Sequence, residues 1–218
     1  MARYGDISGG TPSGVSSDTS LDIARVDSPD PCFDDIWEKL SIYYPLAVVR
    51  NSPYMAWRFF DHPMKRYQIW VLGEVGKEGK DSASALGSPE NPSVAPMENQ
   101  ATGSPLGCLN NPMGYAVIQE REHGRGAVMV DMLMPPSHAK VGAFMEKLCQ
   151  KLGQRGIHTL ETWLPRDHFL TDIFAECGFQ RGDEPIGIIP TVRLFDSGLD
   201  MDAVCRDFYY TMGDGDLF

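Results

Sequence analysis

The sequence lacks an apolar run long enough to cross a membrane. Its longest apolar stretch, residues 126–136, is interrupted by Asp131 and falls far short of the ~20 residues that a spanning helix needs. The first residues also lack the apolar stretch of a secretory signal. These absences predict a cytoplasmic protein without a membrane partner.

Positive charge is scarce in this chain. Its 218 residues include 30 Asp and Glu against 19 Lys and Arg, so the formal net charge is −11 at pH 7. The basic residues are scattered along the sequence, and a surface of negative sign repels a phosphate backbone. The sequence therefore predicts that nucleic acid is not a partner.

Cysteine pairs and catalytic signatures are missing as well. The cysteines stand at Cys32, Cys108, Cys149, Cys177 and Cys205, with no CxxC motif and no histidine pair nearby. An odd number of widely spaced cysteines favours neither a disulfide framework nor a zinc site. No Ser-His-Asp order and no phosphate-binding loop signature is present, which argues against hydrolases and nucleotide triphosphatases. We expect free thiols and no metal.

Two segments rich in small and polar residues interrupt the apolar pattern. Residues 1–20 have no apolar periodicity and predict a flexible tail. Residues 76–112 are dominated by Gly, Pro, Ser and Asn, which predicts a disordered insertion. Its flanks, residues 70–74 and 113–121, read as two arms of one hairpin. We therefore expect a single domain over residues 21–218 that carries this insertion.

The remaining apolar spacing predicts alternating strands and helices. The expected strands are 21–26, 67–72, 114–120, 127–134, 157–164, 179–181 and 186–194, with a short extended piece at 46–49. The expected helices are 33–44, 54–60, one from 136 or 137 to 153 or 156, and 166–177. This order predicts an α/β protein with a mixed sheet.

Several of these segments resemble a known enzyme superfamily. They are the hairpin Gly114-Tyr115-Ala116-Val117 into Val128-Met129-Val130-Asp131, the strand Leu160-Glu161-Thr162-Trp163 and the helix end Ala175-Glu176-Cys177-Gly178-Phe179. In this order they resemble the GNAT superfamily of acyl-CoA N-acyltransferases. Tyr54, Trp57, Arg58 and Phe59, together with residues 210–216, resemble a bacterial group of that superfamily. Some of its members look like two GNAT-like halves, and this chain is similar to the second.

The resemblance implies a fold, a co-substrate and a reaction. The fold is α+β, with a mostly antiparallel sheet that is flanked by helices and splayed between strands 127–134 and 157–164. Acetyl-CoA or another acyl-CoA is expected in that opening, where an amine of a small molecule or peptide attacks the thioester directly. A homodimer is one assembly that the resemblance implies. If strands 127–134 and 157–164 were hydrogen-bonded to each other along their whole length, or if side chains filled the opening between them, acyl transfer would be contradicted.

The resemblance also implies which residues hold the co-substrate. The pantetheine arm is expected on the backbone of Met132, Leu133 and Met134. The pyrophosphate is expected at the start of the following helix, where free N–H groups and the positive end of the helix dipole attract anions. There the chain offers Ser137, His138, Ala139 and Lys140.

Two carboxylates are candidates for the proton transfer. Asp131 stands in an otherwise apolar strand and is read as a base, or else as a carboxylate that faces solvent or caps a loop. Glu161 is read as a base, or else as the partner of a surface arginine. His168 is read as a residue of the opening or as a solvated histidine.

Two departures from the superfamily pattern keep a second function open. Residues 135–142 contain two prolines, which lack N–H donors, and the spacing of small residues that lets a backbone approach phosphates is not recovered. Phe174 stands where many members have a tyrosine that protonates the leaving thiolate. The alternative to the N-acyltransferase is therefore a catalytically degenerate GNAT-fold module that binds acyl-CoA or another protein.

Two further segments have structural and functional interpretations. Trp57 and Arg58 are predicted on a helix that faces the core, with the guanidinium pairing an acid, in preference to substrate binding. The carboxyl-terminal segment with Asp214 and Asp216 either folds over the acceptor site, where it would attract a cationic amine, or frays.

Overall fold

A five-stranded sheet lies at the centre of the chain, in the order β1-β3-β4-β5-β6. Its strands are β1 (Leu21–Val26), β3 (Gln68–Val75), β4 (Leu109–Glu120), β5 (Gly126–Leu133) and β6 (Thr159–Thr162). Every neighbouring pair is antiparallel except β5 and β6, which run parallel. The computed structural model describes residues 19–75, 106, 109–121, 124–165, 167–182, 193, 195, 198 and 200–215.

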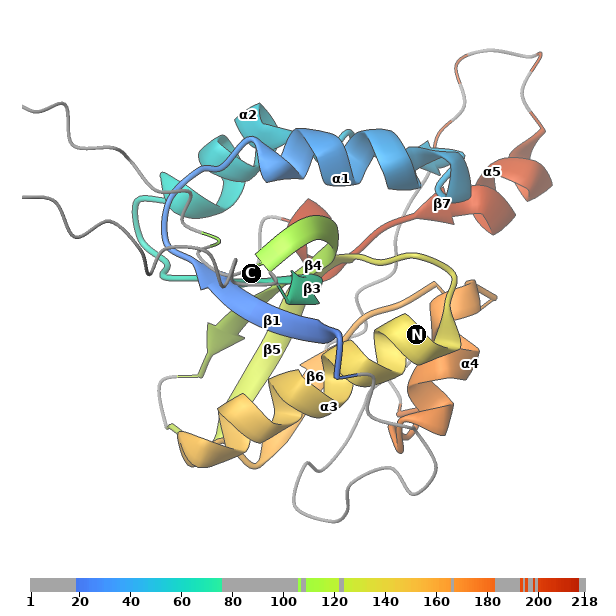
Figure 1. Cartoon of the computed structure of the whole chain (residues 1–218). Helices are drawn as coiled ribbons and strands as arrows, with labels where there is room; N and C mark the ends of the chain where they lie inside the picture. Colours follow the sequence, from blue (N-terminus) through green and yellow to red (C-terminus); the bar gives the residue numbers. More distant parts are fainter. Residues whose placement is uncertain are drawn as a thin grey trace, which may run out of the picture.

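Helices cover both faces of this sheet. Figure 1 shows α1 (Cys32–Leu40) and α2 (Ser52–Met55) on one side, with α3 (His138–Gln154) and α4 (Phe169–Glu176) on the other. The apolar stripe of α1 buries Phe33, Ile36 and Leu40, as its three-and-four spacing predicts. The predicted fold class, a mostly antiparallel mixed sheet flanked by helices, is confirmed. No helix in the described part of the chain is long and apolar enough to span a membrane.

A second, small sheet joins segments that are far apart in the sequence. β2 (Leu46–Ala47) follows the 3-10 turn η1 (Ser41–Tyr43) and pairs in parallel with β7 (Phe208–Tyr209). β7 follows α5 (Met201–Asp207) and precedes the 3-10 turn η3 (Met212–Asp214). The sequence pattern predicted neither α5 nor β7. This pairing brings the carboxyl-terminal segment next to the end of α1.

Some predicted boundaries fall on other residues. The predicted strand at 179–181 is not a strand, and of the segment 186–194 only Arg193 is described. The tail 1–18 and residues 76–105 of the predicted insertion lie outside the described residues. The insertion's carboxyl-terminal boundary was placed too late, because β4 begins at Leu109, where its backbone pairs with Val75 of β3, and both Leu109 and Leu106 are buried.

Leu109 provides a direct test of this corrected boundary. We expect Leu109→Ala to lower the free energy of unfolding by about 2–3 kcal/mol, because truncation of a buried leucine leaves a cavity. Leu46→Ala, at a leucine with a 37% exposed side chain, is the matched control and should cost less than about 1 kcal/mol. Equal urea-unfolding curves for both variants would place Leu109 outside the core.

The parallel pair β5–β6 joins only over its first half. The register runs from Gly126 opposite Thr159 to Met129 opposite Thr162, where β6 ends. β5 continues to Leu133 and pairs there with β4 alone among the described strands. The pairing of the two central strands therefore ends at Met129, within the region where the resemblance implies a splay.

Candidate functional site

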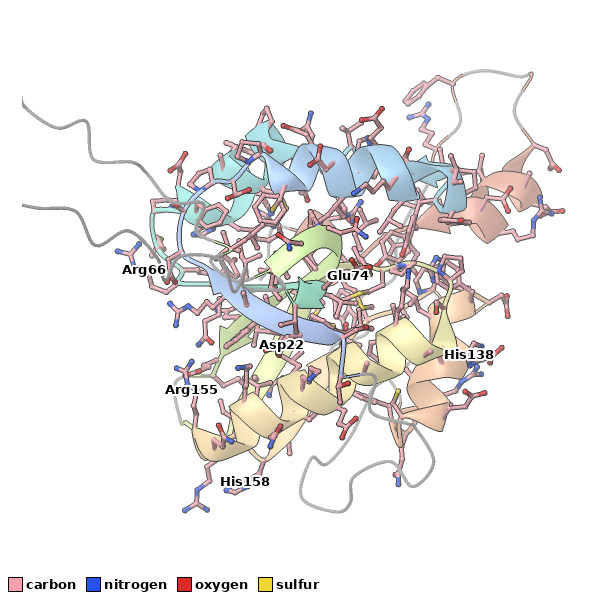
Figure 2. All side chains as sticks on the ribbon, viewed as in Figure 1. Asp22, Arg66, Glu74, His138, Arg155 and His158 are labelled. Atoms are coloured by element: carbon pink, nitrogen blue, oxygen red, sulfur yellow. The ribbon has the colours of Figure 1, made fainter. Side chains whose placement is uncertain are left out.

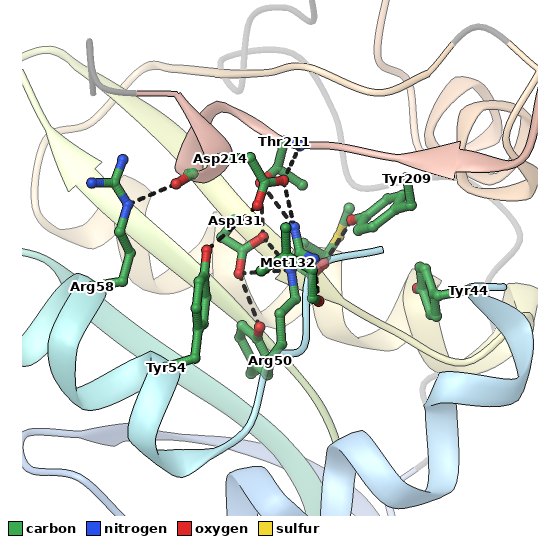
Figure 3. Close-up of polar contacts among 12 residues, drawn as sticks. Tyr44, Arg50, Tyr54, Arg58, Asp131, Met132, Tyr209, Thr211 and Asp214 are labelled. Atoms are coloured by element: carbon green, nitrogen blue, oxygen red, sulfur yellow. Dashed lines mark hydrogen bonds and ion pairs between the residues drawn. The ribbon is translucent and has the colours of Figure 1, made fainter. Parts of the chain in front are cut away.

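The edge of β5 beyond Met129 is the part of the molecule where a bound acyl-CoA was expected. The hydroxyl of Tyr209 lies on that edge (Figure 3), and the hydroxyl of Tyr44 lies on Met134, the residue that follows β5. The hydroxyl of Tyr209 donates to the carbonyl of Met132 at 2.6 Å. The hydroxyl of Tyr44 donates to the carbonyl of Met134 at 2.6 Å and accepts from its N–H at 3.0 Å. The Tyr44 hydroxyl thus bonds both the carbonyl and the N–H of Met134, the two backbone groups with which an amide of a bound ligand would pair.

Aromatic rings fill the space beside these hydroxyls. Tyr44 and Tyr209 are only 3% and 1% exposed, and their ring centroids lie 4.6 Å apart. His168 lies 4.7 Å from Tyr209, and Phe169 lies 5.7 Å from Tyr44, both measured between ring centroids. Burial raises the pKa of both tyrosines well above the ordinary range, so each remains a phenol that can donate a hydrogen bond. The expected opening therefore contains side chains of the chain itself.

His168 lies in this cluster, as one of its two interpretations proposed, and it also caps α4. Its Nδ1 accepts from the N–H of Leu170, while its Nε2 is buried without a hydrogen-bond partner in the described part of the chain. Burial lowers the pKa of His168 to about 4, because a charged imidazolium would lose its hydration there.

This low pKa predicts a loss of stability in acid. Between about pH 6.5 and pH 4 the unfolded chain holds a proton on His168 that the folded chain does not, so stability falls as the pH falls. We expect a loss of about 3 kcal/mol from this residue, measured by urea unfolding across that pH range. His168→Asn keeps a side chain that can accept the capping hydrogen bond but does not titrate. It should therefore remove the contribution of this residue to the slope of unfolding free energy against pH. An unchanged slope would show that another group causes it.

Asp131 lies on the face of the sheet that α1 and α2 cover, and its carboxylate is fully engaged. One oxygen accepts from Arg50 Nε at 3.0 Å and from Thr211 Oγ1 at 2.8 Å. The other accepts from the hydroxyl of Tyr115 at 2.9 Å. Burial raises the pKa of Asp131, while the neighbouring Arg50 guanidinium opposes that rise. Arg50 Nε also reaches this second oxygen at 3.3 Å, so the carboxylate is buried and each of its oxygens accepts two hydrogen bonds.

Arg50 is the centre of this network. Its side chain has no exposed surface, and it pairs with Asp131 at 3.0 Å and with Asp214 at 2.6 Å. Burial alone would lower the pKa of Arg50, but the two carboxylates raise it well above its ordinary value. Its Nη1 also donates to the carbonyl of Val48 at 2.9 Å. One buried cation therefore connects β5, the segment after β2 and the carboxyl-terminal segment.

The carboxyl-terminal segment folds over this cluster rather than fraying. Asp214 forms a capping box with Thr211 around η3, and Gly213 approaches so closely that an added Cβ would meet the Asp131 Cβ at 3.1 Å. Asp216 lies outside the described residues. The segment covers Asp131 itself. The carboxylate of Asp214 pairs with Arg50 and is not directed toward a ligand.

The structure corrects the interpretation of Trp57 and Arg58. Trp57 is 69% exposed instead of facing the core. Arg58 donates to the carbonyls of Gly213, at 2.7 Å, and Gly215, so it holds the carboxyl-terminal segment instead of pairing an acid. The reason is the π-helical turn η2 (Ala56–Phe60), which adds a residue to the turn and rotates its side chains relative to an α-helix.

Glu161 and Phe174 have ordinary structural surroundings. Glu161 pairs with Arg121 at 2.5 Å on a half-exposed surface, which is the alternative given for it above. It lies on β6 opposite Val128, in the paired half of the two central strands. Phe174 is fully buried and packs 4.8 Å from Phe179, between ring centroids, so no proton donor stands at that position.

The start of α3, where a pyrophosphate was expected, is already capped and carries an acid nearby. Ser137 accepts from the N–H of Lys140 at 3.4 Å and so serves as the cap of the helix. His138, labelled at that end of α3 in Figure 2, pairs with Glu176 at 2.6 Å. Ala139 is exposed and Lys140 is half-buried. A carboxylate at this end opposes the binding of a second anion.

The sequence interpretation missed the residues that organise this site. They are Tyr44, Arg50, Tyr115, Tyr209 and Thr211, which touch either Asp131 or the edge of β5. One signal was present: Arg50 is the only charged residue between Lys39 and Arg58, and it follows an apolar run. A lone charge after such a run indicates a special environment but does not identify its partner.

The arrangement as a whole is a closed polar network in a packed interior. No cluster of three or more His, Cys, Asp or Glu side chains among the described residues could hold a metal ion. The geometry provides hydrogen bonds that fix the carboxyl-terminal segment to the sheet, and two tyrosine hydroxyls take the carbonyl of Met132 and both backbone groups of Met134. Among known proteins, no family model, no curated protein and no solved structure matches the chain.

Proposed function

We propose that this chain is a GNAT-like module that binds another protein and does not transfer acyl groups. The observation that carries the proposal is the pair of hydroxyls, from Tyr44 and Tyr209, on the edge of β5. A pantetheine arm would have to displace both tyrosines from a buried cluster before it could pair with that strand. Such displacement would leave two large aromatic side chains without their packing partners.

The candidate chemical groups support the same conclusion. A general base must reach the proton it removes, and Asp131 is buried beneath three donors. Phe174 offers no proton to a leaving thiolate. The carboxylate of Glu176, from the end of α4, reaches His138 at the start of α3, where the pyrophosphate would bind. Each feature alone weakens acyl transfer, and together they favour the non-catalytic alternative.

One observation favours a second candidate, an acetyl-CoA-dependent N-acyltransferase acting on a primary amine. The central strands β5 and β6 separate beyond Met129 and Thr162, as an acyl-CoA-binding sheet requires. In that case Tyr44 and Tyr209 would leave the edge of β5 when the co-substrate enters. The partly exposed Glu161 would then be the carboxylate better placed to accept the amine's proton, because Asp131 stays paired with Arg50.

Calorimetry with acetyl-CoA distinguishes the two candidates. We expect no heat and no thermal shift of the chain up to millimolar acetyl-CoA, and no release of free thiol with a panel of primary amines. Saturable binding followed by amine-dependent thiol release would overturn the proposal and establish the transferase. Glu161→Gln would then test the assigned base against Glu146→Gln, a change at another glutamate, on α3.

A further inference from the structure

An apolar ridge lies on the surface between α1 and α2. We define the ridge as Ile42, Tyr43, Pro45, Leu46, Val48 and Val49, all of which are exposed. Ile42 is 74% exposed and Val49 is 50% exposed. Residues 41–49 contain no charged side chain. Exposed apolar side chains gathered in one surface segment are characteristic of protein interaction sites.

Buried anchors hold the ridge in place. Tyr44, within it, is bound to Met134 by two hydrogen bonds. Arg50, directly after it, donates to the carbonyl of Val48 and is fixed by Asp131. The ridge therefore cannot turn its apolar side chains inward without breaking these bonds. A preorganised apolar surface loses little conformational entropy when a partner binds.

Acidic side chains stand on α1 and α5, the helices before and beside the ridge segment. In Figure 1, α5 and β7 lie beside the end of α1, and Leu46 pairs with Phe208. The acids of α1 are Asp34, Asp35 and Glu38, and those of α5 with its cap are Asp200, Asp202 and Asp207. These six acids outnumber the two bases of the same helices, Lys39 and Arg206, even though Arg206 pairs with Asp207.

We propose that the ridge binds a protein segment with apolar side chains flanked by lysine or arginine. The acidic flanks complement such a segment, whereas a second copy of this chain, with a net charge of −11, would be repelled. This inference rests on the proposed function and names the chemistry of the partner.

Two labelled peptides test the inference with the full chain. One alternates valine with lysine, and the other alternates valine with glutamate. We expect saturable binding of the lysine peptide by fluorescence anisotropy, weakened by added salt, and no binding of the glutamate peptide. The double variant Val48→Ser, Val49→Ser should weaken binding by about tenfold or more. Met64→Ser, at an 89% exposed residue outside the ridge, should leave binding unchanged.

Other results would overturn the inference. Equal affinity for both peptides, or binding that the Val48 and Val49 changes do not weaken, would exclude the ridge as a basic-segment site. A dimer in sedimentation that these changes dissociate would make a second copy the occupant. All variants change exposed residues, and matching urea-unfolding curves verify their fold. If neither the lysine peptide nor acetyl-CoA binds, this inference is overturned and the proposed function is not. Release of free thiol from acetyl-CoA in the presence of an amine overturns the proposed function.

Discussion

Replacing Arg50 by methionine is expected to lower the free energy of unfolding by about 3–5 kcal/mol. The change removes the cation that pairs with both Asp131 and Asp214 in the described part of the chain, and Asp131 is only 1% exposed. A buried carboxylate without a partner is strongly destabilising. Urea unfolding followed by tryptophan fluorescence measures the loss, which should appear as a lower midpoint.

Two controls separate this effect from the loss of any arginine. Arg25→Met removes an ion pair with Asp27 whose side chains are 43% and 72% exposed, and it should cost less than about 1 kcal/mol. Adding Asp131→Asn to Arg50→Met should recover part of the loss, because the buried negative charge is removed as well. If Arg50→Met and Arg25→Met unfold at the same urea concentration, the buried network does not stabilise the fold.

The double change Tyr44→Phe, Tyr209→Phe is expected to cost about 3–4 kcal/mol of unfolding free energy. It keeps both rings but removes the hydroxyls that satisfy the carbonyl of Met132 and both backbone groups of Met134. Each buried polar group left without a partner costs about 1–3 kcal/mol. Thermal and urea unfolding should report the same loss.

Tyr43 provides the matched control for this experiment. It neighbours Tyr44 in the sequence but is 43% exposed, so Tyr43→Phe should leave stability within about 0.5 kcal/mol of the unchanged protein. A double variant as stable as this control would mean that water or another group reaches the edge of β5. That result would also weaken the argument against acyl-CoA binding.

Regular elements of this fold could be predicted from local patterns. The spacing in α1 and the apolar run of β5 each depend on neighbouring residues, and both elements form within a few residues of their expected bounds. The mixed sheet follows from their order. The beginning of β4 was misplaced because glycine, proline and asparagine surround Leu109 and conceal its pairing with Val75.

The contacts of the site could not be predicted in the same way. Arg50 meets Asp131 across 81 positions of sequence, and Tyr44 meets Met134 across 90. No local period encodes such contacts. The unusual position of Asp131 in an apolar strand could be recognised, but its role depends on Arg50 and Thr211, which arrive from other parts of the chain. β7 is too short to leave a pattern, yet it places Tyr209 on the edge of β5.

The amide of Met134 gives the most direct test of whether the edge of β5 is occupied by the chain itself. In a ¹⁵N-labelled sample, acetyl-CoA is titrated to millimolar concentration while the chemical shift of this amide is followed. The hydrogen bond to Tyr44 predicts an amide resonance that does not move. A saturable shift of the Met134 amide would show that the co-substrate displaces Tyr44, and it would contradict the account.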